Sequence, residues 1–130
     1  MTTVLLDTHV LHWWTAEPGN LSEAAAKTVE GADAIAVAAI SWYELAWLAR
    51  QDRIRLTIPV RSWLEELSRH VLTIGVTPAI ADLAVGLPES FPGDPADRLI
   101  YATAIEHGWQ LVTKDRRLRD HRHVRQVTVW

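Results

Sequence analysis

The chain has 130 residues, a length that predicts one domain, and we expect that domain to span residues 1–130. Hydrophobic residues make up 48% and charged residues 22% of the sequence, which excludes intrinsic disorder as the main state. The absence of cysteine excludes disulfide frameworks, thiolate metal sites and cysteine nucleophiles. The sequence has neither a secretory signal nor an apolar run of roughly 20 residues, so we expect a cytoplasmic protein without membrane contact.

The net charge of −3 hides an asymmetry along the chain. Residues 1–49 carry six acids and one base, whereas residues 50–130 carry twelve bases and ten acids. Six of these bases lie between Lys114 and Arg125, opposed only by Asp115 and Asp120. A phosphate-bearing partner and an ordinary solvated surface both fit this basic segment.

Short apolar runs, typical of buried strands, alternate with helical patterns along the chain. In order, the predicted elements are a strand at 4–6, helices at 10–15 and 22–30, a strand at 34–39, helices at 41–51 and 60–69, a strand at 71–76, helices at 78–85 and 95–107, and strands at 110–112 and 126–129. This alternation predicts an α/β domain with a mainly parallel central sheet and helices on both faces.

Four carboxylates follow predicted strands. Asp7 comes directly after the strand at 4–6, and Asp115 lies three residues after the strand at 110–112. Glu44 and Asp97 lie in the first turns of predicted helices. In a doubly wound sheet, the strand ends and the starts of the following helices share one edge, where such folds bind ligands. We therefore expect all four carboxylates at that edge.

Each acid also has a purely structural explanation. Ser41 and Glu44 form a capping-box pattern, and Asp94 with Asp97 fits an N-cap followed by a favourable acid. Asp7 and Asp115 could each close a tight turn. Capping does not require all of these residues at the same edge, so their joint placement favours a common site.

A group of neighbouring carboxylates raises its own pKa values unless a cation compensates the charge. Oxygen ligands suit Mg²⁺ or Mn²⁺, and the sequence has no cysteine or HExxH pattern that would indicate zinc. A divalent ion held in this way can activate water for attack on phosphorus. The chain lacks a P-loop and a G-x-S-x-G motif, and this chemistry needs neither.

Four segments in order, residues 5–14, 39–46, 94–104 and 111–117, resemble the PIN-domain ribonucleases of the VapC family. These are toxins of type II toxin–antitoxin pairs. The resemblance implies a PIN-like fold, and it implies that Asp7, Glu44, Asp97 and Asp115 hold Mg²⁺ or Mn²⁺. It further implies endonucleolytic cleavage of RNA, often structured RNA such as tRNA, which inhibits translation and growth. A cognate antitoxin that covers the acidic cleft and a homodimer of the toxin are also implied. The fourth acidic position varies in the family, which makes Asp115 the weakest match.

Several other polar residues allow two interpretations. His9 and His12, three residues apart, could bind metal, but a packing or supporting role is the stronger interpretation. Thr8 and Thr113 could orient carboxylates or simply serve turns. Arg98 follows an acid directly and could contact a phosphate or form a salt bridge.

The chain contains seven tryptophans, more than a core of this size needs. Trp42, Trp47 and Trp63 lie on predicted helices between the second and third strands. Either a partner surface or core packing accounts for each of them.

Two other functions compete with a ribonuclease. A phosphohydrolase with an aspartyl nucleophile at Asp7 would need an acid two residues later, where the chain has His9. A non-catalytic RNA- or protein-binding module on a PIN-like fold is the second alternative. Loss of RNA cleavage on metal chelation would distinguish a nuclease from such a module.

Overall fold

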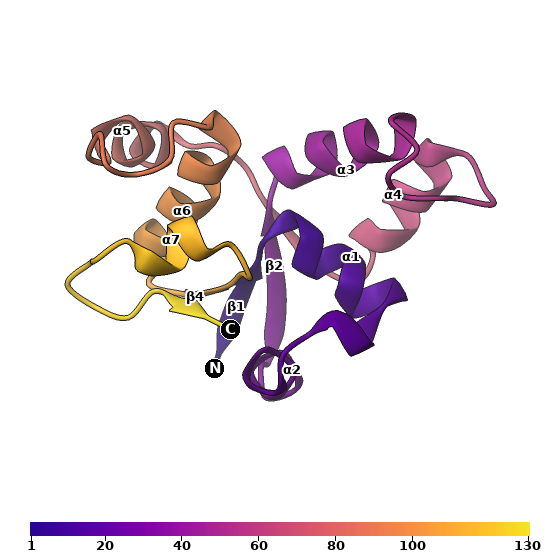
Figure 1. Cartoon of the computed structure of the whole chain (residues 1–130), viewed down its shortest axis with the longest axis horizontal. Coiled ribbons are helices and arrows are strands. Elements are labelled where there is room, and N and C mark those ends of the chain that lie inside the picture. The colour runs from indigo at the N-terminus through magenta and orange to yellow at the C-terminus, as the bar shows by residue number, and fades with distance from the viewer.

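The computed structural model describes residues 1–130 and contains one five-stranded, fully parallel sheet (Figure 1). Its strands are β1 (Thr3–Leu6), β2 (Ala34–Ala38), β3 (Leu72–Ile74), β4 (Gln110–Val112) and β5 (Thr128–Val129). The strand order is β3-β2-β1-β4-β5, so the chain builds outward from β1 in one direction and then in the other. The switch lies between β1 and β4, the position where open α/β sheets form a ligand crevice.

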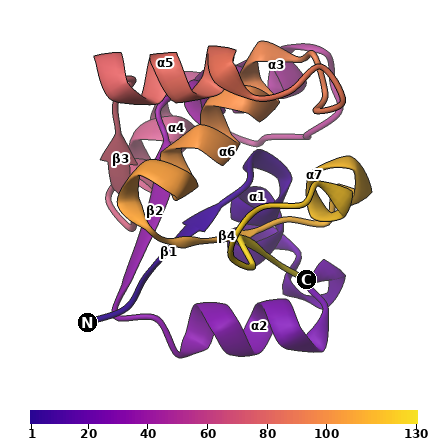
Figure 2. The ribbon, with the colours of Figure 1, turned by 90° about the vertical axis from the view of Figure 1, so that its left-hand side faces the viewer.

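Helices cover both faces of the sheet, which confirms the predicted α/β class (Figures 1 and 2). They are α1 (Thr8–Ala16), the 3₁₀ turn η1 (Pro18–Asn20), α2 (Glu23–Glu30), α3 (Ile40–Arg50), α4 (Val60–Ser68), α5 (Pro78–Gly86), α6 (Pro95–His107) and α7 (Arg116–Asp120). No helix is long and apolar enough to cross a membrane.

The sheet has a hydrophobic core on each face, because successive side chains along a strand point to opposite faces. In β1, Val4 and Leu6 pack into a core with residues of α1, α2, α3 and α4. Leu5 points to the opposite face and packs with residues of α6 and α7. Each of these three β1 side chains is buried, as expected for a central parallel strand covered on both faces. The sheet is thereby rigid at the strand whose end carries Asp7.

The ends of the helices follow the local sequence signals closely. The Ser22 hydroxyl accepts from the backbone N–H of Ala25 at the start of α2. Helix α6 has the predicted limits because the Asp94 carboxylate caps its start. Gly108 ends it in the left-handed conformation, with φ of 68°.

Several predicted boundaries were wrong. Helix α1 begins at Thr8 rather than Val10, because Asp7 caps it. Helix α3 begins at Ile40, so Ser41 lies inside the helix and is fully buried instead of capping it. The strands predicted at 71–76 and 126–129 are shorter, and the five-residue helix α7 was not predicted.

Arg98 joins a loop to the start of α6 and forms no salt bridge. Its guanidinium donates hydrogen bonds of 2.9 to 3.2 Å to the backbone carbonyls of Ala84, Leu87, Pro88, Phe91 and Pro92. It also lies 5.8 Å from the centre of the buried Phe91 ring. The loop at 87–93 is thus tied to the helix that carries Asp97.

We expect both Arg98→Ala and Arg98→Lys to destabilise the fold by about 2 to 3 kcal/mol. A lysine keeps the charge, but its compact ammonium cannot reproduce the planar fork that reaches several carbonyls. Urea denaturation followed by circular dichroism measures the effect, with the exposed Arg116→Ala as the control. A lysine variant as stable as the natural chain would contradict this role.

Candidate active site

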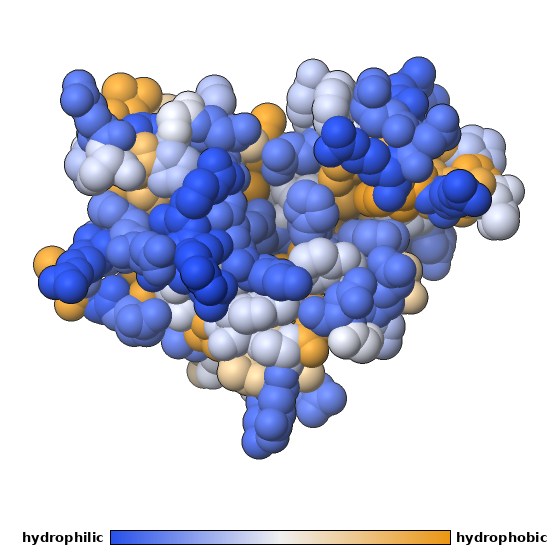
Figure 3. Space-filling view, viewed as in Figure 1, coloured by the Kyte–Doolittle hydropathy of each residue, from blue (hydrophilic) through white to orange (hydrophobic).

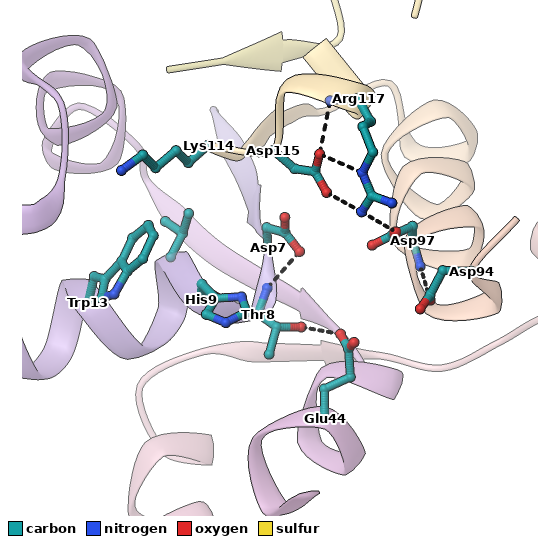
Figure 4. A pocket seen from close by; sticks show the side chains of 11 residues that line it. Asp7, Thr8, His9, Trp13, Glu44, Asp94, Asp97, Lys114, Asp115 and Arg117 are labelled. Carbon is teal, nitrogen blue, oxygen red and sulfur yellow. Dashed lines mark hydrogen bonds and ion pairs between the residues drawn. The ribbon is translucent and has the colours of Figure 1, made fainter. Parts of the chain in front are cut away.

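A cleft of about 500 Å³ opens at the carboxyl ends of β1 and β4, and all four predicted acids line it (Figure 4). Its lining consists of Asp7, Glu44, Asp94, Asp97 and Asp115 together with Thr8, His9, Val10, Trp13, Lys114 and Arg117. The space-filling view shows the surface indented between the side formed by α1 and α3 and the side formed by α6 and α7 (Figure 3). Residues distant in sequence therefore meet at the edge that the strand pattern predicted.

Asp7 is held by hydrogen bonds to both of its carboxylate oxygens. Oδ1 accepts from the backbone N–H of Thr8 at 2.8 Å, and Oδ2 accepts from the Thr113 hydroxyl at 2.6 Å. The Asp7 backbone N–H continues the sheet by donating to the Val112 carbonyl. Burial raises the pKa of Asp7, although both of these hydrogen bonds act in the opposite direction. The carboxylate is thus positioned at the junction of β1, α1 and β4.

Glu44 is joined to the same junction through Thr8. The Thr8 hydroxyl donates to Oε1 of Glu44 at 2.5 Å and lies 3.0 Å from the buried Ser41 hydroxyl. Glu44 therefore does not bond back to the Ser41 amide, and the capping-box interpretation was wrong. Burial raises the pKa of Glu44, and the charge of Asp7 raises it further. Thr8 therefore orients a carboxylate. Thr113 has both of the roles weighed for it, because its hydroxyl donates to Asp7 and also accepts from the backbone N–H of Asp115 in a turn.

Asp97 and Asp115 face each other across Arg117. Burial, followed by the charges of Asp94, Asp7 and Asp115, raises the pKa of Asp97 to about 7. Nη2 of Arg117 lies 2.8 Å from Oδ2 of Asp115 and 3.2 Å from Oδ2 of Asp97. The closer hydrogen bond to Arg117 lowers the pKa of Asp115. The cleft thus holds five acidic side chains against two basic ones, Lys114 and Arg117.

The donor set of the cleft fits a hard divalent cation. The predicted ligands are carboxylates, and burial together with the neighbouring acids Asp94, Asp7 and Asp115 raises the pKa of Asp97. As the side chains stand, no three acidic or histidine side chains converge closely enough to hold an ion. The Arg117 guanidinium lies between two of the acids and competes with a metal for them. Convergence therefore requires side-chain rotation and displacement of Arg117.

Sequence reasoning did not identify Lys114, Trp13 and Arg117 as cleft residues. The Lys114 ammonium lies 5.7 Å from the centre of the Trp13 ring (Figure 4). The backbone N–H of Arg117 donates to Oδ1 of Asp115, which caps α7. An acid followed two residues later by a base is the signal that could have indicated this turn.

The two histidines do not form a joint metal site. His9 lines the cleft, with its ring centre 5.8 Å from that of Trp13. His12 instead lies beside Glu17 and packs its ring edge against Trp63. The structure therefore supports the packing interpretation for His12.

Only one of the three singled-out tryptophans is an exposed surface residue. Trp42 and Trp63 pack against the core, and the Trp42 indole donates to the Thr73 hydroxyl at 3.0 Å. Trp47 is 47% exposed on α3. Trp42 and Trp63 are half-buried, so Trp47 is the one of the three that the structure leaves exposed.

In the basic segment between Lys114 and Arg125, some side chains make contacts within the protein and others are exposed without an ion pair. Arg117 pairs with acids of the cleft, and Arg125 donates to the carbonyls of Ala104 and Trp109. Arg116 and Arg122 are exposed and form no ion pair in the structure. A nucleic-acid phosphate could reach these two without breaking internal contacts.

Residues 4–124 match the family model described as the PIN domain. Over all 130 residues, and over the full length of both proteins, the chain is 72% identical to "Ribonuclease VapC22" of Mycobacterium tuberculosis (strain ATCC 25618 / H37Rv).

Solved structures with the same fold come from bacterial complexes. A toxin–antitoxin complex from Klebsiella pneumoniae is 21% identical with a TM-score of 0.63, over 86% of each chain. VapBC2 from Rickettsia felis, bound to a DNA fragment from its promoter, is 17% identical with a TM-score of 0.61, over 88% of this chain and 89% of that one. VapBC-1 from nontypeable Haemophilus influenzae is 17% identical with a TM-score of 0.67, over 88% and 87%.

Proposed function

Because the chain belongs to the PIN-domain family, and within it to the VapC proteins, we propose that it is a metal-dependent endoribonuclease toxin of a type II toxin–antitoxin pair. It hydrolyses phosphodiesters of RNA, including structured RNA such as tRNA, in the cytoplasm and thereby inhibits translation and growth. The observation that carries this proposal is the meeting of Asp7, Glu44, Asp97 and Asp115 in one cleft. The 72% identity to a protein named a ribonuclease supports it.

In this proposal Asp7, Glu44 and Asp97 hold Mg²⁺ or Mn²⁺, and Asp115 joins them when Arg117 moves away. The bound ion supplies activated water and neutralises charge that develops on the phosphate. The protein supplies orientation, since hydroxyls of Thr113 and Thr8 fix Asp7 and Glu44.

Two cations at the rim of the cleft face the RNA. Lys114 lies beside Trp13, on the side of the cleft opposite Arg117 (Figure 4). It forms no ion pair with the acids. Lys114 is therefore free to contact a phosphate next to the one that is cut, and a displaced Arg117 can contact another.

The proposal is tested with purified protein and total tRNA in Mg²⁺ or Mn²⁺. We expect endonucleolytic products that disappear on addition of EDTA, return with excess Mn²⁺, and are absent from an identically prepared Asp7→Asn variant. RNA that is bound but not cut in either ion would indicate a non-catalytic PIN-like module. Hydrolysis of a phosphate monoester instead of RNA would indicate another metal-dependent phosphohydrolase.

We expect the double variant Arg116→Ala/Arg122→Ala to bind all RNAs more weakly and with a lower salt dependence. The slope of log K against log salt is negative, and each lost phosphate contact reduces its magnitude by about 0.7 to 0.9. Loss of the pair therefore makes the slope shallower by about 1.5. Fluorescence anisotropy with labelled tRNA over a KCl series, in the Asp7→Asn background, measures the slope. Arg61→Ala on α4 is the control. An unchanged slope would assign both arginines to an ordinary solvated surface.

A cognate antitoxin that inserts an arginine into the cleft is the proposed inhibitor. Arg117 already shows that a guanidinium fits between Asp97 and Asp115, and the three structural neighbours come from toxin–antitoxin complexes. We expect the co-purified complex with the product of the adjacent small gene to lose RNase activity even in excess Mg²⁺. A stoichiometric complex with full activity would contradict occlusion of the cleft.

Light scattering of the free chain tests the proposed homodimer.

A further inference from the structure

A second, smaller hollow opens directly beside the acidic cleft. Its volume is about 250 Å³, and it shares three lining residues, His9, Glu44 and Asp94, with the cleft. Its other walls are Tyr43, Trp47 and Leu48, all from α3. An RNA strand whose phosphate lies among the carboxylates would therefore pass this hollow.

The wall of the hollow is aromatic and exposed. Tyr43 and Trp47 are four residues apart on α3, so they project from the same face of the helix. Tyr43 is 68% and Trp47 is 47% exposed. Neither ring stacks on another aromatic ring of the chain, and the guanidinium of Arg53 lies 5.9 Å from the centre of the Trp47 ring. Exposed planar rings beside a phosphate track are the arrangement on which nucleobases stack.

Resting on the proposed ribonuclease function, we propose that this hollow is a subsite for one unpaired nucleobase next to the phosphodiester that is cut. The base stacks on Trp47 or Tyr43, and its edge faces the carboxylates of Glu44 and Asp94. Carboxylates accept from amino groups, so the subsite favours adenine, cytosine or guanine. Uracil offers a single N–H between two carbonyl oxygens and is disfavoured there.

The chemistry of the lining favours a base over an apolar side chain of a protein partner. His9, Glu44 and Asp94 make up half of the lining residues. An aliphatic anchor would bury the two carboxylates without giving them a hydrogen bond, which is costly. A nucleobase covers the rings with its face and satisfies the carboxylates with its edge.

The test uses single-stranded RNA heptamers bound in Mn²⁺ by the Asp7→Asn variant, which does not cut them. The probes are A₇, C₇, U₇ and A₇ with one abasic residue at each position in turn. We expect one abasic position to weaken binding about 5- to 150-fold, because base–aromatic stacking contributes about 1 to 3 kcal/mol. Adding Tyr43→Ala and Trp47→Ala together should reduce this penalty to less than about twofold, and the pair Tyr43→Phe and Trp47→Phe should restore it. Val85→Ala, at an 83% exposed position of α5, is the matched control that changes nothing.

The edge of the base is tested separately with Asp94→Asn. Asparagine caps a helix as well as aspartate, so α6 keeps its start, but the amide adds a donor. We expect the preference for A₇ and C₇ over U₇ to shrink, and an unchanged preference would overturn the role of this carboxylate.

An abasic penalty that survives Trp47→Ala and Tyr43→Ala together would overturn the subsite. Weaker antitoxin binding by those variants with unaltered RNA binding would overturn it too, and would assign the rings to a protein interface. These failures are distinct from a failure of the proposed function, which is absence of RNA cleavage by the natural chain in Mn²⁺.

Discussion

Replacing Asp7, Glu44 or Asp97 by its amide is expected to abolish RNA cleavage while the chain stays folded. All three line the cleft, and loss of one charged ligand removes several kcal/mol of stabilisation from the activated water and the phosphate. At about 1.4 kcal/mol for each factor of ten, this corresponds to a loss of roughly a thousandfold or more. Single-turnover cleavage of tRNA in Mn²⁺ measures the effect, and circular dichroism checks the fold.

The structure supplies a sharp control in Glu44→Gln. A glutamine keeps the oxygen that accepts from Thr8, so the local hydrogen bond survives and only the charge is lost. Full cleavage by Glu44→Gln would therefore show that Glu44 is a structural partner of Thr8 and holds no metal. Asp115→Asn should be milder, because Arg117 already neutralises Asp115 and an amide oxygen can still bind weakly.

Much of the fold could be predicted because its signals are local. Apolar runs of three to five residues mark the strands, and caps such as Ser22, Asp94 and Gly108 mark the helix ends. The acids were placed at one edge by a general property of parallel sheets, which does not depend on side-chain detail. Local sequence patterns were therefore enough to predict the α/β class that the structure confirms.

The contacts that were missed join residues far apart in the chain. Arg117 reaches Asp97 across 20 residues, and Thr8 reaches Glu44 across 36. The second contact overrides the local capping signal at Ser41. Helix α7 has a single buried apolar residue, Leu118, and thus no periodicity that could have revealed it.

The exposure of each tryptophan also could not be predicted from its neighbours in the sequence. Trp42 and Trp47 lie on the same helix, yet one donates a hydrogen bond to Thr73 and the other faces the smaller hollow. Which side of a helix meets the core depends on the neighbouring helices, and the helical period alone does not fix it when both sides are apolar.

The metal-free protein is expected to lose stability, relative to Asp97→Asn, as the pH rises from about 4 to 8. The pKa of Asp97 is about 7 in the folded chain and near 3.8 when unfolded, so the folded state binds more protons between these values. Its free energy of unfolding must then fall as the pH rises through this window. Asp94, Asp7 and Asp115 face Asp97 and raise its pKa, whereas Arg117 opposes them.

Asparagine does not titrate, so the difference between the two proteins reports the ionisation of Asp97 together with its charge coupling to Asp94, Asp7, Asp115 and Arg117. It should be near zero below about pH 4 and complete above about pH 8, with an upper bound of about 4 kcal/mol in favour of the variant, since one pKa unit is about 1.4 kcal/mol. Urea denaturation in EDTA at five pH values measures it, and the titrations of His12 and Glu44 cancel because both proteins contain them. Mn²⁺ at pH 8 should then stabilise the natural chain much more than the variant, because only the natural chain has the full set of charged ligands. A stability difference that stays constant from pH 4 to 8 would show that folding does not shift the pKa of Asp97.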